Sequence, residues 1–420
     1  MAMTETLGGQ NLDQFKRRQT LITGWVLIGL AILVAGVFGL ESQGNATFRL
    51  SLPNDAMKIP NLVVPSAPYS YVVAAILAFF GVRQFMRGGA RWSSLFLGIG
   101  LLLVVTAFLV WAADGKAFSL TGMLESTVVR AVPIALGGLA GVLSERVAVV
   151  NIGIEGMLLA GAFAGAIVGS LLGGIIGIGA AIVVGGMFGF ILGALVITYR
   201  VDQIIAGVAI NLFVLGMTSY VSSQVLTEYR FLNDAPVFRA INIPMLSDLP
   251  VVGPVLFSQN IFVYGALIMV VVATYYLFYT RLGLRARAVG EHPEAADTLG
   301  IDVYRTRFVN VTLAGMVAGF GGAWFTLGSV GRFDEGMTGG RGFIGLAAMI
   351  FGRWHPVGAL LAALVFGFAD SLQQKLAILQ TPIPSEFLAM APYIATIVLV
   401  AGVVGRARAP AADGKPYIKD

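Results

Sequence analysis

Two short stretches of this sequence carry polar residues at spacings that could do chemistry. The first is Asn151-Ile-Gly-Ile-Glu-Gly156, in which Asn151 and Glu155 are four residues apart. On a helix, residues at this spacing share one face. Glu155 lies in an apolar segment, where an ionised carboxylate is costly and marks either a transport pathway or a paired site. A hydrogen bond that only packs two helices together is the alternative explanation.

The second stretch, 285–301, predicts a short helix of about two turns between two membrane spans. Pro293 suits the first helical position, acidic residues follow it early, and Gly300 suits the end. Ala295 and Ala296 give this helix a small-residue face on which a partner protein can lie closely. A solvated connector with no partner is the alternative.

Other polar residues give little support to an enzyme. The sequence has no Gly-x-x-x-x-Gly-Lys-[Ser/Thr] loop, so it lacks the usual phosphate-binding motif of an ATPase. It has no cysteine, its two histidines are far apart, and no nucleophile stands beside a base. Arg130 and Asp370 also fall in apolar segments, and Glu125 is a candidate partner for Arg130. We therefore expect no catalytic residues and no metal site.

The composition places the elements that carry these residues in a lipid bilayer. Of the 420 residues, 57% are hydrophobic and 12% are charged, whereas soluble domains have about 25% charged residues. Apolar runs of about 20 residues match the thickness of a bilayer. The short alternating segments of a membrane β-barrel are absent. We predict an all-α integral membrane protein, a polytopic bundle of about 10–12 transmembrane helices with short or broken helices in a glycine-rich core.

Hydropathy predicts a series of membrane spans along the chain. We expect them at about 21–40, 69–82, 93–113, 122–143, 148–170, 174–198, 204–221, 260–280, 306–330, 357–376 and 387–405. Whether the short apolar piece 342–352 crosses the bilayer is left open. About 20 polar residues precede the first span, so the N-terminus does not resemble a cleaved signal peptide.

Basic residues orient the bundle. Lys16, Arg17 and Arg18 precede the first predicted span, and Arg406 and Arg408 follow the last one. Lys and Arg accumulate on the cytoplasmic side, so both termini are expected in the cytoplasm. The segment 281–305 is then the largest cytoplasmic loop between spans.

Glycine is frequent, with 54 residues, and often recurs every fourth position. This spacing lets two helix backbones approach closely in lipid. Broken helices around a cavity are also compatible with so much glycine. The four-residue spacing occurs at Gly161, Gly165 and Gly169, at Gly185, Gly189 and Gly193, and at Gly315 and Gly319.

Together, the stretch 151–156, the Glu-Ala-Ala segment and the run 339–358 resemble a known family. The resemblance is to bacterial ABC-importer permeases for ribose-type sugars, branched-chain amino acids and nucleosides. It is strongest to the nucleoside (simple-sugar-like) branch that works with basic-membrane-lipoprotein receptors. The predicted organisation is an extra N-terminal transmembrane region at 1–118 with about three spans, a permease core at 119–405 with the coupling loop 281–305 inside it, and a cytoplasmic tail at 406–420.

The resemblance implies a multi-pass subunit in the bacterial inner membrane that is not itself an enzyme. Its implied partners are a second permease, identical or homologous, two cytoplasmic ABC ATPases and an extracytoplasmic substrate-binding lipoprotein; no nucleic acid is involved. ATP is used by the ATPases, and this chain binds no cofactor. Carried over by position, the ATPase-coupling residues are Arg287, Gly290, Glu294, Ala295, Ala296 and Gly300. The residues near the substrate pathway are Asn151, Gly153, Glu155 and Gly156.

The expected cargo is a nucleoside. A pentose or other simple sugar, or a branched-chain amino acid, is the alternative for the same kind of permease. An ion-coupled secondary transporter is the alternative from another class. Such a transporter predicts paired buried charges in several spans, and this sequence has only scattered ones.

Overall fold

The computed structural model describes residues 18, 20–53, 57–87, 90–379, 387, 390 and 408–419. These residues divide into two compact units. Unit 1 contains the described residues up to Gly122, together with 374–379 and Phe387. Unit 2 contains 123–373, Met390 and the C-terminal segment 408–419. Each unit has its own hydrophobic core.

Unit 1 is built from three apolar helices and a small sheet. The helices are the span Thr20–Gly39, α2 (Ser66–Arg87) and α3 (Ala90–Ala112). Strand β1 (Asn45–Arg49) pairs antiparallel with β2 (Leu62–Pro65) and parallel with β3 (Ala117–Ser119). Buried side chains that the three helices contribute, Leu27, Val34, Leu77 and Phe96 among them, form the core of this unit.

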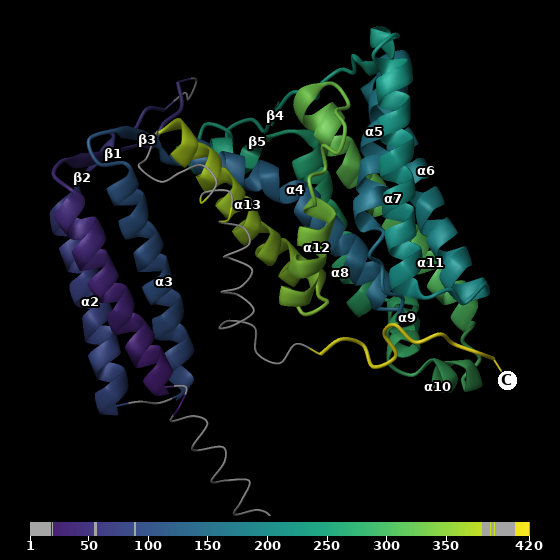
Figure 1. Ribbon diagram of the computed structural model, residues 1–420, viewed down its shortest axis with the longest axis horizontal. Helices are drawn as coiled ribbons and strands as arrows, with labels where there is room; N and C mark the ends of the chain where they lie inside the picture. The colour runs from purple at the N-terminus through teal and green to yellow at the C-terminus, as the bar shows by residue number, and fades with distance from the viewer. Residues whose placement is uncertain are drawn as a thin grey trace, which may run out of the picture. The chain divides into compact units, whose positions relative to one another are not determined.

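Unit 2 contains the longer series of helices (Figure 1). They are α4 (Leu120–Glu145), α5 (Ile154–Leu172), α6 (Gly174–Gly193), α7 (Gln203–Val221), α8 (Ile261–Tyr279), α9 (Arg281–Glu291), α10 (Pro293–Thr298), α11 (Val303–Phe325), α12 (Arg341–Phe351) and α13 (Pro356–Ile378). Between α7 and α8, the two-residue strands β4 (Ile241–Asn242) and β5 (Ser258–Gln259) pair antiparallel.

The described residues contain ten helices that are long and apolar enough to cross a membrane. This confirms the predicted all-α polytopic fold. Helix α12 has only 11 residues, so at about 1.5 Å per residue it is too short to span the bilayer. The predicted span 387–405 lies almost entirely outside the described residues, as do Lys16, Arg17 and Arg406.

Two local predictions need correction. The span expected at 148–170 begins only at Ile154, because the residues after Glu145 form turns. Asn151 therefore precedes helix α5 and does not share a helical face with Glu155. The segment 281–305, predicted to hold one short helix, holds two. Helix α9 starts directly after Thr280, whose side chain caps it by accepting from the amide of Gly283.

Helices α5, α6 and α11 of unit 2 meet through glycines. A Cβ atom on Gly319 of α11 would clash with the carbonyl oxygen of Ala181 and lie 3.1 Å from the Cα of Gly185, both in α6. A Cβ on Gly161 of α5 would lie 2.5 Å from the carbonyl oxygen of Gly319. The four-residue glycine spacing thus marks direct backbone contact between three helices.

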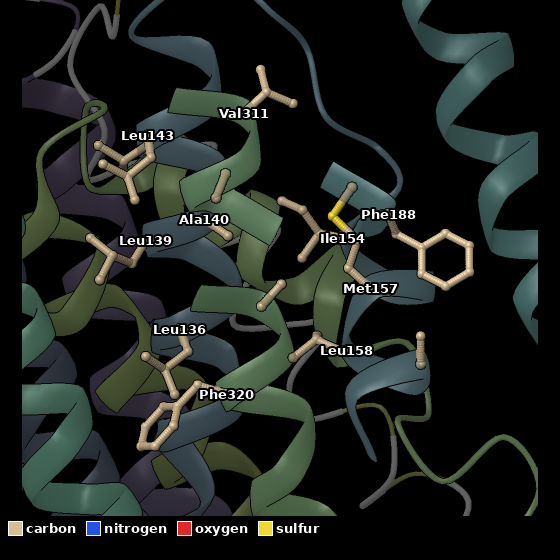
Figure 2. Packing of buried hydrophobic residues seen from close by; sticks show 14 of the residues in the cluster. Leu136, Leu139, Ala140, Leu143, Ile154, Met157, Leu158, Phe188, Val311 and Phe320 are labelled. Carbon is tan, nitrogen blue, oxygen red and sulfur yellow. The ribbon is translucent and has the colours of Figure 1, made fainter. Parts of the chain in front are cut away.

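Large apolar side chains fill the space beside these contacts (Figure 2). Leu136 and Leu139 of α4, Met157 and Leu158 of α5, and Phe320 of α11 are all buried. Because α6 also contributes Phe188, four helices share one core. This core fixes the positions of the helix ends where the polar residues lie.

We predict that Gly319→Ala destabilises the protein, because the new methyl group needs space that α6 occupies. Overpacking of this kind costs about 1–3 kcal/mol. Thermal unfolding of the purified protein in detergent should occur several degrees lower than in the wild type. The control is Gly179→Ala on α6, where an added Cβ meets nothing within 4 Å. Equal melting temperatures for the two variants would contradict the close contact.

Candidate functional site

The predicted coupling helix is present as α10, and its ends follow the sequence signals. Pro293 occupies its first turn, where a missing backbone N–H costs nothing. Gly300 follows the helix with a φ of +79°, a conformation that side chains disfavour. The next helix, α11, begins at once, with Asp302 as its cap accepting from the amide of Arg305 at 2.9 Å. The segment is therefore a rigid corner between two helices.

The residues predicted for coupling separate into an inner and an outer set. Arg287 is half-buried, and Gly290 and Ala296 are buried, the latter 2% exposed. The outer set is Glu294, Ala295 and Gly300, which are all exposed. Only one of the two predicted alanines thus faces outward. Leu299, next to the outer set, is 81% exposed, so the outer surface combines an acid, a small residue and an apolar side chain.

The inner side of this segment rests on a cluster around Phe278, at the end of α8. The guanidinium groups of Arg287 and Arg146 lie 5.0 Å and 5.6 Å from the centre of its ring, and His355 stacks on the ring at 4.6 Å. Such cation–π contacts favour a fixed position for both arginines. Burial lowers the pKa of the Arg146 guanidinium. Phe278 therefore joins the loop after α4, helix α9 and the turn before α13.

Arg146 also connects to the turn after α12 through hydrogen bonds. Its Nε donates to the carbonyl oxygen of Trp354 at 2.8 Å. The indole of Trp354 in turn donates to the carboxylate of Glu145 at 2.6 Å. Arg146 thus connects Phe278, on which helix α9 rests, to the turn that follows α12.

The loop before α5, 149–153, is held by helix α7. Gln203 accepts from the amide of Val150 at 2.7 Å. Asn211 donates to the carbonyl oxygen of Ile152 at 2.9 Å and accepts from the amide of Gly156 at 2.7 Å. Sequence reasoning missed both residues, although a single Asn in an apolar span is a signal, because it needs a partner in lipid.

Asn151 and Gly153 of the predicted pathway set lie in this loop. Asn151 is fully buried, and its Nδ2 lies 3.7 Å from the sulfur of Met157. Its Oδ1 has no hydrogen-bond partner among the described residues. Gly153 is buried at the start of α5, against Gly207 of α7. These two positions shape the entrance to α5.

Glu155 has well-defined partners at the start of the short helix α12. One carboxylate oxygen accepts from the amide of Gly340 at 2.8 Å, and the other accepts from the amide of Gly342 at 2.6 Å. The N-terminus of a helix has unpaired amides and a partial positive charge, which a carboxylate satisfies. Glu155 also lies in the first turn of α5, so its negative charge is close to the N-termini of both helices.

Three further charges lie beside the start of α12. Asp370 of α13 accepts from Arg130 of α4 at 3.0 Å and from Arg341 of α12 at 3.3 Å. The side chains are between 18% and 25% exposed. The structure therefore pairs Arg130 with Asp370, a partner that the sequence did not suggest. Together with Glu155, these groups place two positive and two negative charges in one region of the bundle.

A comparison with protein families identifies the chain. Residues 123–404 match the model of the family described as branched-chain amino acid transport system / permease component. The chain belongs to this family. The resemblance predicted from sequence is confirmed, and the protein is a multi-pass membrane permease of an ABC transport system, the channel component and not the ATPase.

The permease is similar to several named transport proteins. It is 41% identical to the guanosine ABC transporter permease NupQ of Bacillus subtilis, over 71% of this chain and 96% of that one. It is 38% identical to the nucleoside permease NupC of Lactococcus lactis, with the same two shares. A putative glucose permease of Haloferax volcanii, TsgC13, is 34% identical over 60% of this chain and 77% of its own. No solved structure matches the permease significantly.

We predict that Glu155→Gln strongly reduces uptake by the assembled transporter in proteoliposomes. Glutamine keeps the shape but has one carbonyl oxygen, so it can accept from only one of the two amides and carries no charge. Hydrogen bonds to charged groups are worth about 1.5–3 kcal/mol each, so we expect uptake to fall about tenfold. Asn151→Ala should act in the same direction. Expression and receptor binding should stay normal for both variants, and a wild-type rate for Glu155→Gln would contradict the assignment.

Proposed function

We propose that this permease imports a nucleoside. The observation that carries the proposal is the 41% identity with a guanosine permease over 96% of that relative's length. The family match over residues 123–404 includes the start of α5, the α12 region and the segment α9–α10. The nucleoside permease of Lactococcus supports the same substrate class. The similarity to a putative glucose permease keeps a simple sugar as the second candidate.

The charges at the start of α12 are suited to a polar, uncharged cargo. Arg130 and Arg341 offer N–H donors, and Asp370 offers acceptor oxygens, all partly exposed. A nucleoside presents hydroxyl groups on its ribose and both donors and acceptors on its base. We assign these three side chains to the substrate pathway and give Glu155 a positioning role, because its carboxylate is engaged by Gly340 and Gly342.

We also propose that the permease is one subunit of a larger importer. A second permease completes the channel, two cytoplasmic ATPases hydrolyse ATP, and an extracytoplasmic lipoprotein delivers the nucleoside. The chain itself binds no cofactor. It lies in the inner membrane with both termini in the cytoplasm, as the distribution of Lys and Arg favours. The segment α9–α10 then faces the ATPases.

The substrate proposal predicts that proteoliposomes with the full importer accumulate radiolabelled guanosine only when the ATPase subunits and ATP are present. Excess unlabelled adenosine or uridine should compete for uptake, and glucose, ribose and leucine should not. The control is an ATPase variant that binds ATP without hydrolysing it. No accumulation of guanosine, together with ATP-dependent accumulation of radiolabelled glucose, would favour the sugar transporter instead.

The coupling proposal predicts that Ala295→Arg abolishes nucleoside-dependent ATP hydrolysis while the permease remains abundant in the membrane. Ala295 is exposed on α10, so a large charged side chain interferes with a docked partner and not with the fold. Ala296→Arg is unsuitable because Ala296 is buried. The matched control is Ala117→Arg, at an exposed alanine in β3 of unit 1, outside the proposed docking segment, and it should leave coupling intact. Hydrolysis that survives Ala295→Arg would rule out docking on this surface.

A further inference from the structure

The C-terminal segment 408–419 lies along the coupling helices and the start of α11 (Figure 1). The sequence presents it only as a basic cytoplasmic tail. In the structure, the amide of Ala412 donates to the carbonyl oxygen of Gly290 at 3.1 Å. The amide of Ala411 donates to the carboxylate of Glu291 at 3.2 Å. Both contacts bind the tail to the last turn of α9.

The same segment then reaches α10 and α11. Lys419 forms an ion pair with Asp297 of α10 at 3.2 Å. Tyr417 is only 6% exposed, and its ring lies 5.6 Å from that of Tyr304, near the start of α11. Hydrogen bonds from Lys419 and Tyr417 hold the pKa of Asp297 below its usual range. A segment of 12 residues thus contacts three consecutive helices.

Two buried charged residues, Arg307 and Glu145, have partners in the tail. Arg307 of α11 is 2% exposed, and its Nη1 donates to the carbonyl oxygen of Lys415 at 3.4 Å. Asp413 interacts electrostatically with Arg307 and shares a hydrogen bond with Glu145. Burial raises the pKa of Asp413 to about 6. Removal of the tail would leave the Arg307 guanidinium without this compensation, which is costly for a buried charge.

We propose that residues 408–419 form an intramolecular strap that holds α9 and α10 in the orientation required for coupling to the ATPase. The strap occupies the side of α10 that carries Asp297 and leaves Glu294, Ala295 and Leu299 exposed. It therefore contacts α10 on the side opposite its exposed surface and leaves that surface free for a partner. This inference rests on the proposed coupling role of α10.

The first arm of the test asks whether the strap is docked, and it needs no ATPase. The chain has no cysteine, so single cysteines report on their own position. Ala412 is buried and Ala411 is exposed, which makes Ala412→Cys and Ala411→Cys a matched pair. In inverted membrane vesicles, we expect a maleimide reagent to modify the Ala412→Cys variant at least tenfold more slowly. Equal rates would overturn the strap, and labelling of Ala411→Cys in intact cells by an impermeant reagent would overturn the cytoplasmic orientation.

The second arm removes the buried ring. Tyr417→Ala should speed the labelling of Ala412→Cys at least fivefold, and the control Ile418→Ala, at a side chain that is 55% exposed, should not change it. In the reconstituted importer, Tyr417→Ala should lower the amount of nucleoside imported per ATP hydrolysed at least threefold. If uptake and ATP hydrolysis fall in proportion, the strap only stabilises the fold and the proposed positioning role is wrong.

A milder variant covers the case in which Tyr417→Ala does not accumulate in the membrane. Tyr417→Phe keeps the ring against Tyr304 and removes only the hydroxyl donor to Asp297. It should change labelling and coupling in the same direction by about twofold, and unchanged values for both would overturn the proposal. A different result would separate the two proposals. If the labelling shows a docked strap but coupling survives Ala295→Arg, then the proposed role of α10 is wrong and the docking of the strap is not.

Discussion

The backbone contact between α5, α6 and α11 is the constraint on which the rest of unit 2 depends. Gly161, Gly185 and Gly319 bring the three helices so close that no side chain fits between them. In lipid, where burial of apolar surface does not drive helices together, such contacts supply much of the packing energy. They also make α11 a stiff element, since it is closely matched to its neighbours. Its first turns carry the coupling corner and its last turns lead to the α12 region.

Buried charges impose the second constraint, because each must find a partner within the bundle. Glu155 finds two backbone amides at the start of α12. Arg130 and Arg341 share Asp370. These contacts join helices far apart in the sequence, so the polar region at the start of α12 cannot rearrange one helix at a time. A set of contacts that must change together is suited to a transporter that switches between a few defined states, and not to a continuously flexible channel.

The sequence predicted what depends on local composition and left out what depends on tertiary contacts. Hydropathy located the ten long apolar helices of the described residues, and Pro293 and Gly300 marked α10, because these signals act within a few residues. Asn151 was expected on a helix, but its loop is shaped by Gln203 and Asn211 of another helix. The inward position of Ala296 and the path of the C-terminal segment depend on neighbours that no spacing rule identifies.

The distance along the chain between Arg130 and Asp370 has a consequence for how the protein is made. The two residues are 240 positions apart, and ribosomes add about 5–20 residues per second. An arginine at the centre of a span costs about 2.5–3.5 kcal/mol on insertion scales. Helix α4 is therefore synthesised about 12–48 s before Asp370, so the ion pair between these two residues is a late contact that can form only when α13 joins the bundle.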